Sequence, residues 1–314
     1  MLASAATLGA TQVGRAATLP QRAAAAPARA AWLEGVRQRN AVLDALFYDV
    51  GVVGQDEAVS ISPWLAAEGA ILVVPPSGAG ALKLYNSVDG FVASGGAEVS
   101  ILAVAGVGSS ALGSAAFARN VADALGKPVA AVVSGYGLAD MAAEALGGFF
   151  WFGMLNGVRH AFEGIDRLTE IGVVQEPWPF AAAGDLPVRQ SRDTRTVLAM
   201  LMEPGLSFDL LVGHSKGNLV ISEALFDLRR QDPGNATALA AAATIVTISA
   251  RIAMPTGFRT LDVMGALDWF GGMNSRLDIA PDHLVAGAWH HTNTELAAHL
   301  PVTSTLRAVL GQDS

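Results

Sequence analysis

The stretch Phe208-Asp-Leu-Leu-Val-Gly-His-Ser-Lys-Gly-Asn-Leu-Val-Ile-Ser-Glu-Ala-Leu-Phe-Asp-Leu228 decides how the rest of the chain is interpreted. A short apolar run meets Gly213-His214-Ser215-Lys216-Gly217, and apolar residues then recur at helical spacing. A strand, a Gly-x-Ser-x-Gly turn and a helix in succession are the usual context of a nucleophilic serine. Such a turn exposes the serine oxygen, and its glycines let two backbones pass without Cβ clashes. The sequence thus predicts that Ser215 is a nucleophile, with a chance structural turn as the alternative.

The rest of the chain alternates between apolar strands and amphipathic helices. We expect strands at 70–74, 99–104, 129–133, 243–250, 259–264 and 284–286, and helices at 31–46, 85–93, 111–125, 194–202 and 294–310, the last one broken or kinked near Pro301. Strands that alternate with helices predict right-handed crossovers and a mostly parallel, doubly wound sheet covered on both faces. The expected fold class is therefore α/β.

Chain length and local composition suggest three parts. Residues 34–137 and 206–314 are expected to form the α/β core. Residues 138–205 form an insertion too long for a single crossover helix, which predicts a helical cap or lid. The first 33 residues are rich in alanine and proline and contain arginine but no acid. We expect residues 1–33 to be a disordered arm, with a targeting leader as the alternative.

The composition excludes several classes of function. The net charge is −8 and no basic stripe is visible, which argues against nucleic-acid binding. The chain has no cysteine, so thiol catalysis, disulfides and cysteine-based zinc sites are excluded. No cluster of His, Asp and Glu has the spacing of metal ligands, and we predict no metal and no cofactor.

The best candidate for a membrane span, residues 146–158, is too short and too rich in glycine to cross a bilayer. This predicts no transmembrane span and leaves only a transient interfacial contact as an option. We expect a cytoplasmic protein, with secretion or organelle targeting left open. The sequence leaves the oligomeric state open.

A serine nucleophile needs a base, and the base needs an orienting acid. In doubly wound sheets such groups gather at the carboxyl ends of the strands. Gly265-Ala266-Leu267-Asp268 follows the strand at 259–264, which predicts Asp268 as the acid. The alternative, Asp262, falls in the middle of that strand, where an unpaired carboxylate would be costly to bury.

The base is expected after the last strand. His290 is the first polar residue there and is the predicted base, with the adjacent His291 as the alternative. The other histidines fit less well: His283 precedes the strand, His214 is interpreted as structural, and His160 and His299 as surface or packing residues.

The chain order Ser215, Asp268, His290 and the Gly-x-Ser-x-Gly turn resemble the α/β-hydrolase superfamily of the lipase/esterase type, over roughly residues 70–310. The segment Ala105-Gly106-Val107-Gly108-Ser109-Ser110 resembles the His-Gly-X-X-X-Ser oxyanion loop of that family, with alanine in place of the histidine. The resemblance implies that the backbone N–H groups of Val107 and Lys216 form the oxyanion hole. The Lys216 side chain either tunes the site or points into solvent.

The same glycine segment also matches part of a dinucleotide-binding motif. It lacks the third glycine at the required spacing, and no acidic partner follows at a strand end. We therefore disfavour dinucleotide binding.

The family resemblance also suggests where the substrate binds. Insertions before the nucleophile commonly cover the active site in this family, which implies that Phe149, Phe150, Trp151 and Phe152 form an apolar acyl pocket. The alternative is ordinary core packing of a cap helix. The predicted function is a cofactor-independent carboxylic-ester hydrolase that acts on an apolar, small or lipid-like ester through an acyl-enzyme. The alternatives are an acyltransferase, a thioesterase, a peptidase or a polyester depolymerase on the same triad, and a non-catalytic binding protein that keeps the fold.

Overall fold

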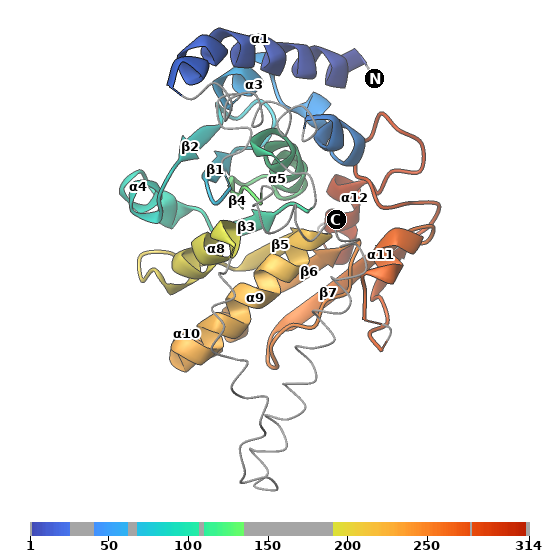
Figure 1. The fold of residues 1–314 in the computed structure, drawn as a ribbon. Coiled ribbons are helices and arrows are strands. Elements are labelled where there is room, and N and C mark those ends of the chain that lie inside the picture. Colours follow the sequence, from blue (N-terminus) through green and yellow to red (C-terminus); the bar gives the residue numbers. More distant parts are fainter. Residues whose placement is uncertain are drawn as a thin grey trace, which may run out of the picture.

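The computed structural model describes residues 2–25, 41–61, 68–106, 110–134, 191–276 and 278–311. Within these ranges the strands form one sheet of eight, in the order β2-β1-β4-β3-β5-β6-β7-β8 (Figure 1). The strands are β1 (Ile71–Val74), β2 (Lys83–Tyr85), β3 (Ile101–Val104), β4 (Val129–Val132), β5 (Leu210–His214), β6 (Thr244–Ile248), β7 (Arg259–Gly265) and β8 (His283–Val285). β1 pairs antiparallel with β2 and β4, and all other neighbours are parallel. The prediction of an α/β fold with a mostly parallel sheet is confirmed.

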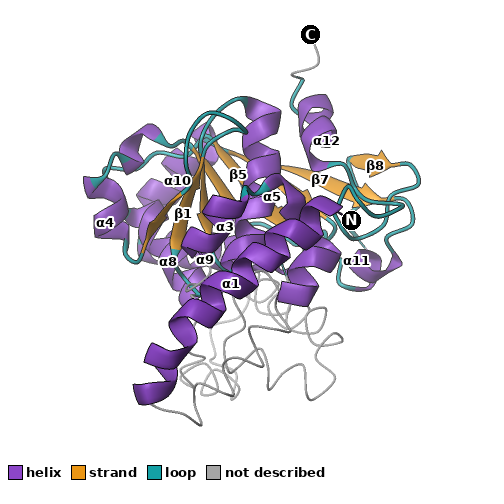
Figure 2. Ribbon diagram, turned by 90° about the horizontal axis from the view of Figure 1, so that it is seen from above, coloured by secondary structure: helices purple, strands orange, loops and turns teal. Residues whose placement is uncertain are grey.

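Helices cover both faces of this sheet (Figure 2). They are α1 (Leu2–Ala25), α3 (Gln55–Ile61), α4 (Val88–Ala93), α5 (Ala111–Leu125), α8 (Arg192–Met202), α9 (Lys216–Gln231), α10 (Pro233–Ala242), α11 (Trp269–Met273) and α12 (Val302–Val309), with 3-10 turns η1 (Val50–Val52) and η3 (Gly96–Glu98). Residues 41–47 are also helical.

Alternating side chains along the central strands divide the interior into two cores. In β5, Leu210 and Val212 join a core that includes α5 and α12, whereas Leu211 joins a core that includes α8 and α9. This alternation is the two-residue period of a strand whose opposite faces are both buried. Because α9 directly follows β5, its buried face fixes the position of the turn between them.

Several elements differ from the sequence-based expectations. Of the expected helix at 85–93, Tyr85 instead ends strand β2, and only residues 88–93 are helical, as α4, whose N-cap Ser87 accepts a hydrogen bond from the N–H of Gly90. The expected helix at 294–310 exists only as α12, which begins directly after Pro301. The predicted break at Pro301 is therefore confirmed, but the residues before it are not helical.

The prediction of a disordered N-terminal arm is wrong for residues 2–25, which form α1. Alanine has the highest helix propensity, so an alanine-rich segment becomes helical once tertiary contacts support it. The Thr7 hydroxyl donates to the Val53 carbonyl, and Glu295 accepts hydrogen bonds from the N–H groups of Ala3 and Ser4. These contacts attach α1 to two segments of the chain that are far apart in the sequence, one at Val53 and one at Glu295.

Of the predicted cap, α8 lies within the described part of the chain, and residues 138–190 lie outside it. Among the described helices, none has both the length and the apolar character that crossing a membrane requires.

Candidate active site

Ser215 lies in a sharp turn between β5 and α9. Its backbone has a φ of 52°, a value that non-glycine residues rarely adopt, and its N–H donates to the Ile248 carbonyl at 2.8 Å. A Cβ on Gly213 would lie 2.2 Å from Asn218 Oδ1, and one on Gly217 would lie 2.0 Å from the Val104 carbonyl oxygen. Both glycines of the Gly-x-Ser-x-Gly turn are therefore required by close backbone packing, as the sequence indicated.

The segment that follows β3 packs directly against this turn. A Cβ on Gly106 would lie 2.7 Å from the His214 carbonyl oxygen, 2.8 Å from Ser215 Cβ and 3.2 Å from the Lys216 nitrogen. Strands β3 and β5 are parallel neighbours, so their carboxyl ends lie at the same edge of the sheet. This arrangement brings the residue before Val107 next to the backbone amide of Lys216.

The structure brings together the three residues expected to act in catalysis. Ser215 Oγ lies 3.0 Å from His290 Nε2, and His290 Nδ1 lies 3.0 Å from each carboxylate oxygen of Asp268. Ser215, His290 and Asp268 keep only 6%, 2% and 5% of their surfaces exposed. A hydroxyl, an imidazole and a carboxylate are thus joined in one hydrogen-bonded line in a nearly dry environment.

Asp268 is held by the short helix that it begins. It follows the end of β7, it is the N-cap of α11, and its Oδ1 accepts a hydrogen bond from the Gly271 N–H at 2.6 Å. The Phe270 and Phe47 rings both lie edge-on to His290, with ring centroids 4.6 and 5.9 Å from that of the imidazole. These aromatic rings limit the positions that the imidazole can take.

The alternative acid and base have other partners. His291 Nε2 lies 3.0 Å from the Ala297 carbonyl oxygen, which places this ring in a different hydrogen bond from that of His290. Asp262 accepts a hydrogen bond from the hydroxyl of Thr247, and its backbone N–H donates to Asp282. Two further histidines also have other surroundings: His283 begins β8, and the His299 ring contacts the Leu296 carbonyl.

The Lys216 side chain is buried, so the alternative in which it points into solvent is wrong. It is 9% exposed, and its Nζ lies 3.8 Å from Oδ2 of Asp193, whose side chain is fully buried in α8. The other oxygen of Asp193 accepts a hydrogen bond from the Thr194 N–H at 2.7 Å. This ion pair connects the first residue of α9 to the helix that precedes β5.

His214, interpreted as structural from the sequence, forms a buried hydrogen-bonded chain with a residue that the sequence analysis missed. The Gly106 N–H donates to Tyr48 Oη at 2.6 Å, and Tyr48 Oη lies 3.2 Å from His214 Nδ1. His214 Nε2 lies 3.0 Å from the His290 carbonyl oxygen. Since that carbonyl can only accept, the His214 proton is on Nε2, and Tyr48 donates to Nδ1. Burial, reinforced by nearby His290, lowers the pKa of His214 to about 3, so it is neutral.

Some of the predicted site residues cannot be placed. Val107, the second expected oxyanion donor, and the aromatic residues Phe149, Phe150, Trp151 and Phe152 lie outside the described residues, as does His160. Within the described ranges no group of three or more His, Asp and Glu side chains could hold a metal ion.

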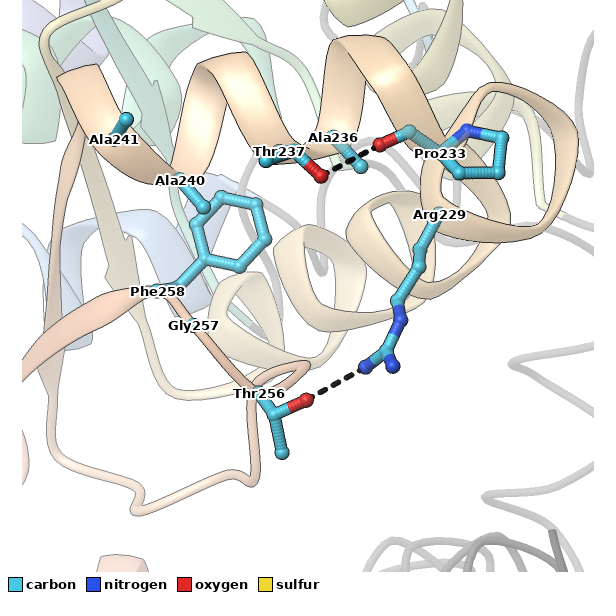
Figure 3. A pocket seen from close by; sticks show the side chains of 9 residues that line it. All are labelled: Arg229, Pro233, Ala236, Thr237, Ala240, Ala241, Thr256, Gly257 and Phe258. Carbon is cyan, nitrogen blue, oxygen red and sulfur yellow. Dashed lines mark hydrogen bonds between the residues drawn. The ribbon is translucent and has the colours of Figure 1, made fainter. Parts of the chain in front are cut away.

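A hollow of about 530 Å³ lies beside the last turn of α9 (Figure 3). It lies between the end of α9, helix α10 and the turn before β7, and it is lined by Arg229, Pro233, Ala236, Thr237, Ala240, Ala241, Thr256, Gly257 and Phe258. Ser215 precedes the N-terminus of α9, and a helix of 16 residues is about 24 Å long. The hollow is therefore separate from the Ser215 site.

Comparison of the chain with protein-family models, with curated proteins and with solved structures finds no match in any of the three.

Proposed function

We propose that this chain is a serine hydrolase with the α/β-hydrolase fold and that it cleaves carboxylic esters. The observation that carries the proposal is the line from Ser215 Oγ through the His290 imidazole to the Asp268 carboxylate, at 3.0 Å in each step. This is the geometry that activates a serine hydroxyl for acyl transfer. The eight-stranded, mostly parallel sheet and the nucleophile turn after β5 are consistent with the fold.

In the proposed reaction, Ser215 Oγ attacks the ester carbonyl carbon while His290 Nε2 takes the hydroxyl proton. Asp268 accepts a hydrogen bond from the Nδ1–H of His290 and stabilises the imidazolium that forms. The tetrahedral intermediate collapses, and His290 returns the proton to the departing alkoxide. Water then attacks the acyl-enzyme, gives a proton to His290 and releases the carboxylic acid, and His290 restores the Ser215 hydroxyl.

The negative charge of the tetrahedral intermediate needs donors that are already in place. The proposed donors are the backbone N–H groups of Lys216 and Val107, each worth about 3 kcal/mol of transition-state stabilisation. Lys216 begins α9, where the helix dipole favours negative charge. Gly106 packs against this amide, which supports a role for the segment after β3 in the same hole.

Apolar side chains beside Asp268 favour an apolar ester as the substrate. Leu267, Trp269 and Met273 are exposed around α11, and the ring of Trp269 lies 6.5 Å from that of Trp289. Exposed apolar groups that cluster beside a reacting centre are typical of a binding surface. The proposed substrate therefore has an aliphatic or aromatic group next to the ester.

The test is to label the protein with a fluorophosphonate, map the adduct by mass spectrometry and measure hydrolysis of p-nitrophenyl butyrate. We expect the adduct on Ser215 and a fall in kcat of about 10⁴-fold or more in Ser215→Ala. Ser304→Ala, which removes an exposed serine hydroxyl on α12, is the matched control and should leave kcat unchanged. A folded Ser215→Ala variant with undiminished activity would refute the proposal.

A further inference from the structure

The short helix at residues 41–47, together with Tyr48 after it, contacts three separate loops of the candidate active site. Asp44 and Tyr48 are four residues apart, so their side chains lie on the same face of the helix. Both residues are fully buried. None of these contacts is used in the proposed reaction.

Asp44 holds the segment that leads into α5. Its Oδ1 accepts the Ser110 N–H at 3.0 Å, and its Oδ2 accepts the Ser110 hydroxyl. Gly113, in the first turn of α5, makes room for both side chains, because a Cβ there would lie 2.1 Å from Asp44 Oδ1 and 2.9 Å from Tyr48 Cδ2. Asp44 therefore holds Ser110, the residue directly before α5.

Tyr48 holds Gly106, which lies just after β3. Its Oη accepts the Gly106 N–H at 2.6 Å and donates to His214 Nδ1, and His214 in turn donates to the His290 carbonyl. One phenolic oxygen thus connects the end of β3, the nucleophile turn and the backbone of the proposed base.

The C-terminal end of the same helix contacts the segment that follows His290. Thr292 donates from both its N–H and its hydroxyl to the Phe47 carbonyl, at 2.7 and 3.0 Å. Asn293 Nδ2 donates to the Ala45 carbonyl at 2.6 Å. These bonds satisfy carbonyls that the end of a helix leaves without intrahelical partners, and they hold the 290–293 segment in position.

We propose that Asp44 and Tyr48 are positioning residues that hold Ser110, before α5, and Gly106, after β3, in register with the Ser215 turn and with His290. The inference rests on the proposed function, in which the Lys216 backbone N–H, against which Gly106 packs, is an oxyanion donor.

Burial raises the pKa of Asp44 to about 7, although the hydrogen bonds from Ser110 oppose this rise. The carboxyl group thus occupies a costly position, where an apolar side chain of similar size would avoid the cost of desolvation. Its two hydrogen bonds from Ser110 offset part of that cost.

The first test removes only the Tyr48 hydroxyl. In Tyr48→Phe we expect kcat for p-nitrophenyl butyrate to fall at least fivefold with KM within twofold of wild type, because misaligned donors affect the transition state more than substrate binding. Tyr85→Phe, which removes a phenolic hydroxyl on edge strand β2, is the matched control and should change neither constant. A fall of less than fivefold in kcat, or an equal rise in KM, would overturn the proposal.

The second test grades the contacts of Asp44. Asparagine keeps one oxygen that can accept the Ser110 N–H, whereas alanine keeps none. We expect kcat to decrease in the order wild type, Asp44→Asn, Asp44→Ala, again with little change in KM. Equal kcat values for all three folded proteins would contradict the proposed role.

A third measurement does not depend on catalysis. Nitrogen NMR of histidine-labelled wild type should show His214 with its proton on Nε2, and Tyr48→Phe should shift its Nδ1 signal. A proton on Nδ1 in wild type would overturn the network, because Tyr48 could not donate to it. If Ser215→Ala stays active, the proposed function fails, and this spectrum still decides whether the network exists.

Discussion

His214 and His290 lie in neighbouring regions of one buried site, with ring centroids 5.2 Å apart, but their partners differ. His290 lies between a carboxylate and a serine hydroxyl. His214 lies between a phenol and a backbone carbonyl. The first set of partners can move a proton, because the carboxylate stabilises the imidazolium. The second set holds a neutral ring in one tautomer.

Their partners, and not burial or position in a motif, distinguish the proposed base from a supporting histidine. Both rings are almost completely buried, and His214 is the closer of the two to Ser215 in the sequence. Of these two rings, only that of His290 is hydrogen-bonded to a carboxylate, that of Asp268.

The reacting group should be the most sensitive to substitution. We expect His290→Gln and Asp268→Asn each to lower kcat about 10⁴-fold, because the first removes the base and the second stabilises the wrong tautomer. The measurement is hydrolysis of p-nitrophenyl butyrate by the folded variants.

The adjacent residue provides the control for this prediction. His291→Gln should change kcat less than tenfold, because the His291 ring contacts the Ala297 carbonyl. A larger loss in His291→Gln than in His290→Gln would reverse the assignment of the base.

The same distinction applies within a single residue at position 216. Its backbone N–H belongs to the proposed oxyanion hole, whereas its side chain pairs with buried Asp193. Lys216→Met keeps the backbone group and leaves a buried carboxylate without its ion-pair partner. We expect a loss of about 3 kcal/mol in the free energy of unfolding and a change in kcat of less than tenfold.

Urea unfolding of the single variant and of Lys216→Met/Asp193→Asn tests this assignment. The double variant should recover part of the lost stability, because the buried charge is also removed. If Lys216→Met is as stable as wild type, the ion pair has no supporting role.

Over the range from pH 7 to 5, the smallest expected effect concerns the pH dependence of stability. Burial, with a contribution from His290, lowers the pKa of His214 from 6.5 to about 3. Between these values the unfolded chain binds a proton that the folded chain excludes, so the free energy of unfolding falls as the pH drops from 6.5 toward 3. The slope is up to about 1.4 kcal/mol per pH unit.

Urea unfolding of wild type and His214→Asn at pH 7, 6 and 5 should show a steeper acid loss in wild type. Asp44 contributes with the opposite sign, because its raised pKa favours the folded state at low pH and this contribution is lost as the pH rises to about 7. Both proteins keep Asp44, so the difference between them isolates His214. Parallel pH profiles would contradict the neutral state of His214.

Much of the fold could be predicted because the signals are local. Helix α5 matches its expected bounds, since Gly126 and Pro128 mark its end. The short strand β2 was missed because three residues at a sheet edge carry little periodicity. The N-terminal helix was missed because its stability depends on contacts with residues far along the chain.

The candidate site was predicted in part. The spacing of Asp268 and His290 after their strands pointed to the residues that contact Ser215 or each other. Asp44 and Tyr48 could have been noticed in the sequence as two polar residues four positions apart, near the end of a predicted helix. No sequence pattern, however, shows what such a face contacts.

The sequence by itself determined the Ser215 turn and the alternation of strands and helices, because these depend on neighbouring residues and on backbone sterics. The tertiary structure decided which histidine meets the serine, where the Lys216 side chain lies, and that Tyr48 connects two loops. Ser215 and His290 are 75 residues apart, and Tyr48 and His214 are 166 apart. The partners and pKa values of such groups depend on burial and distance, which are properties of the folded chain.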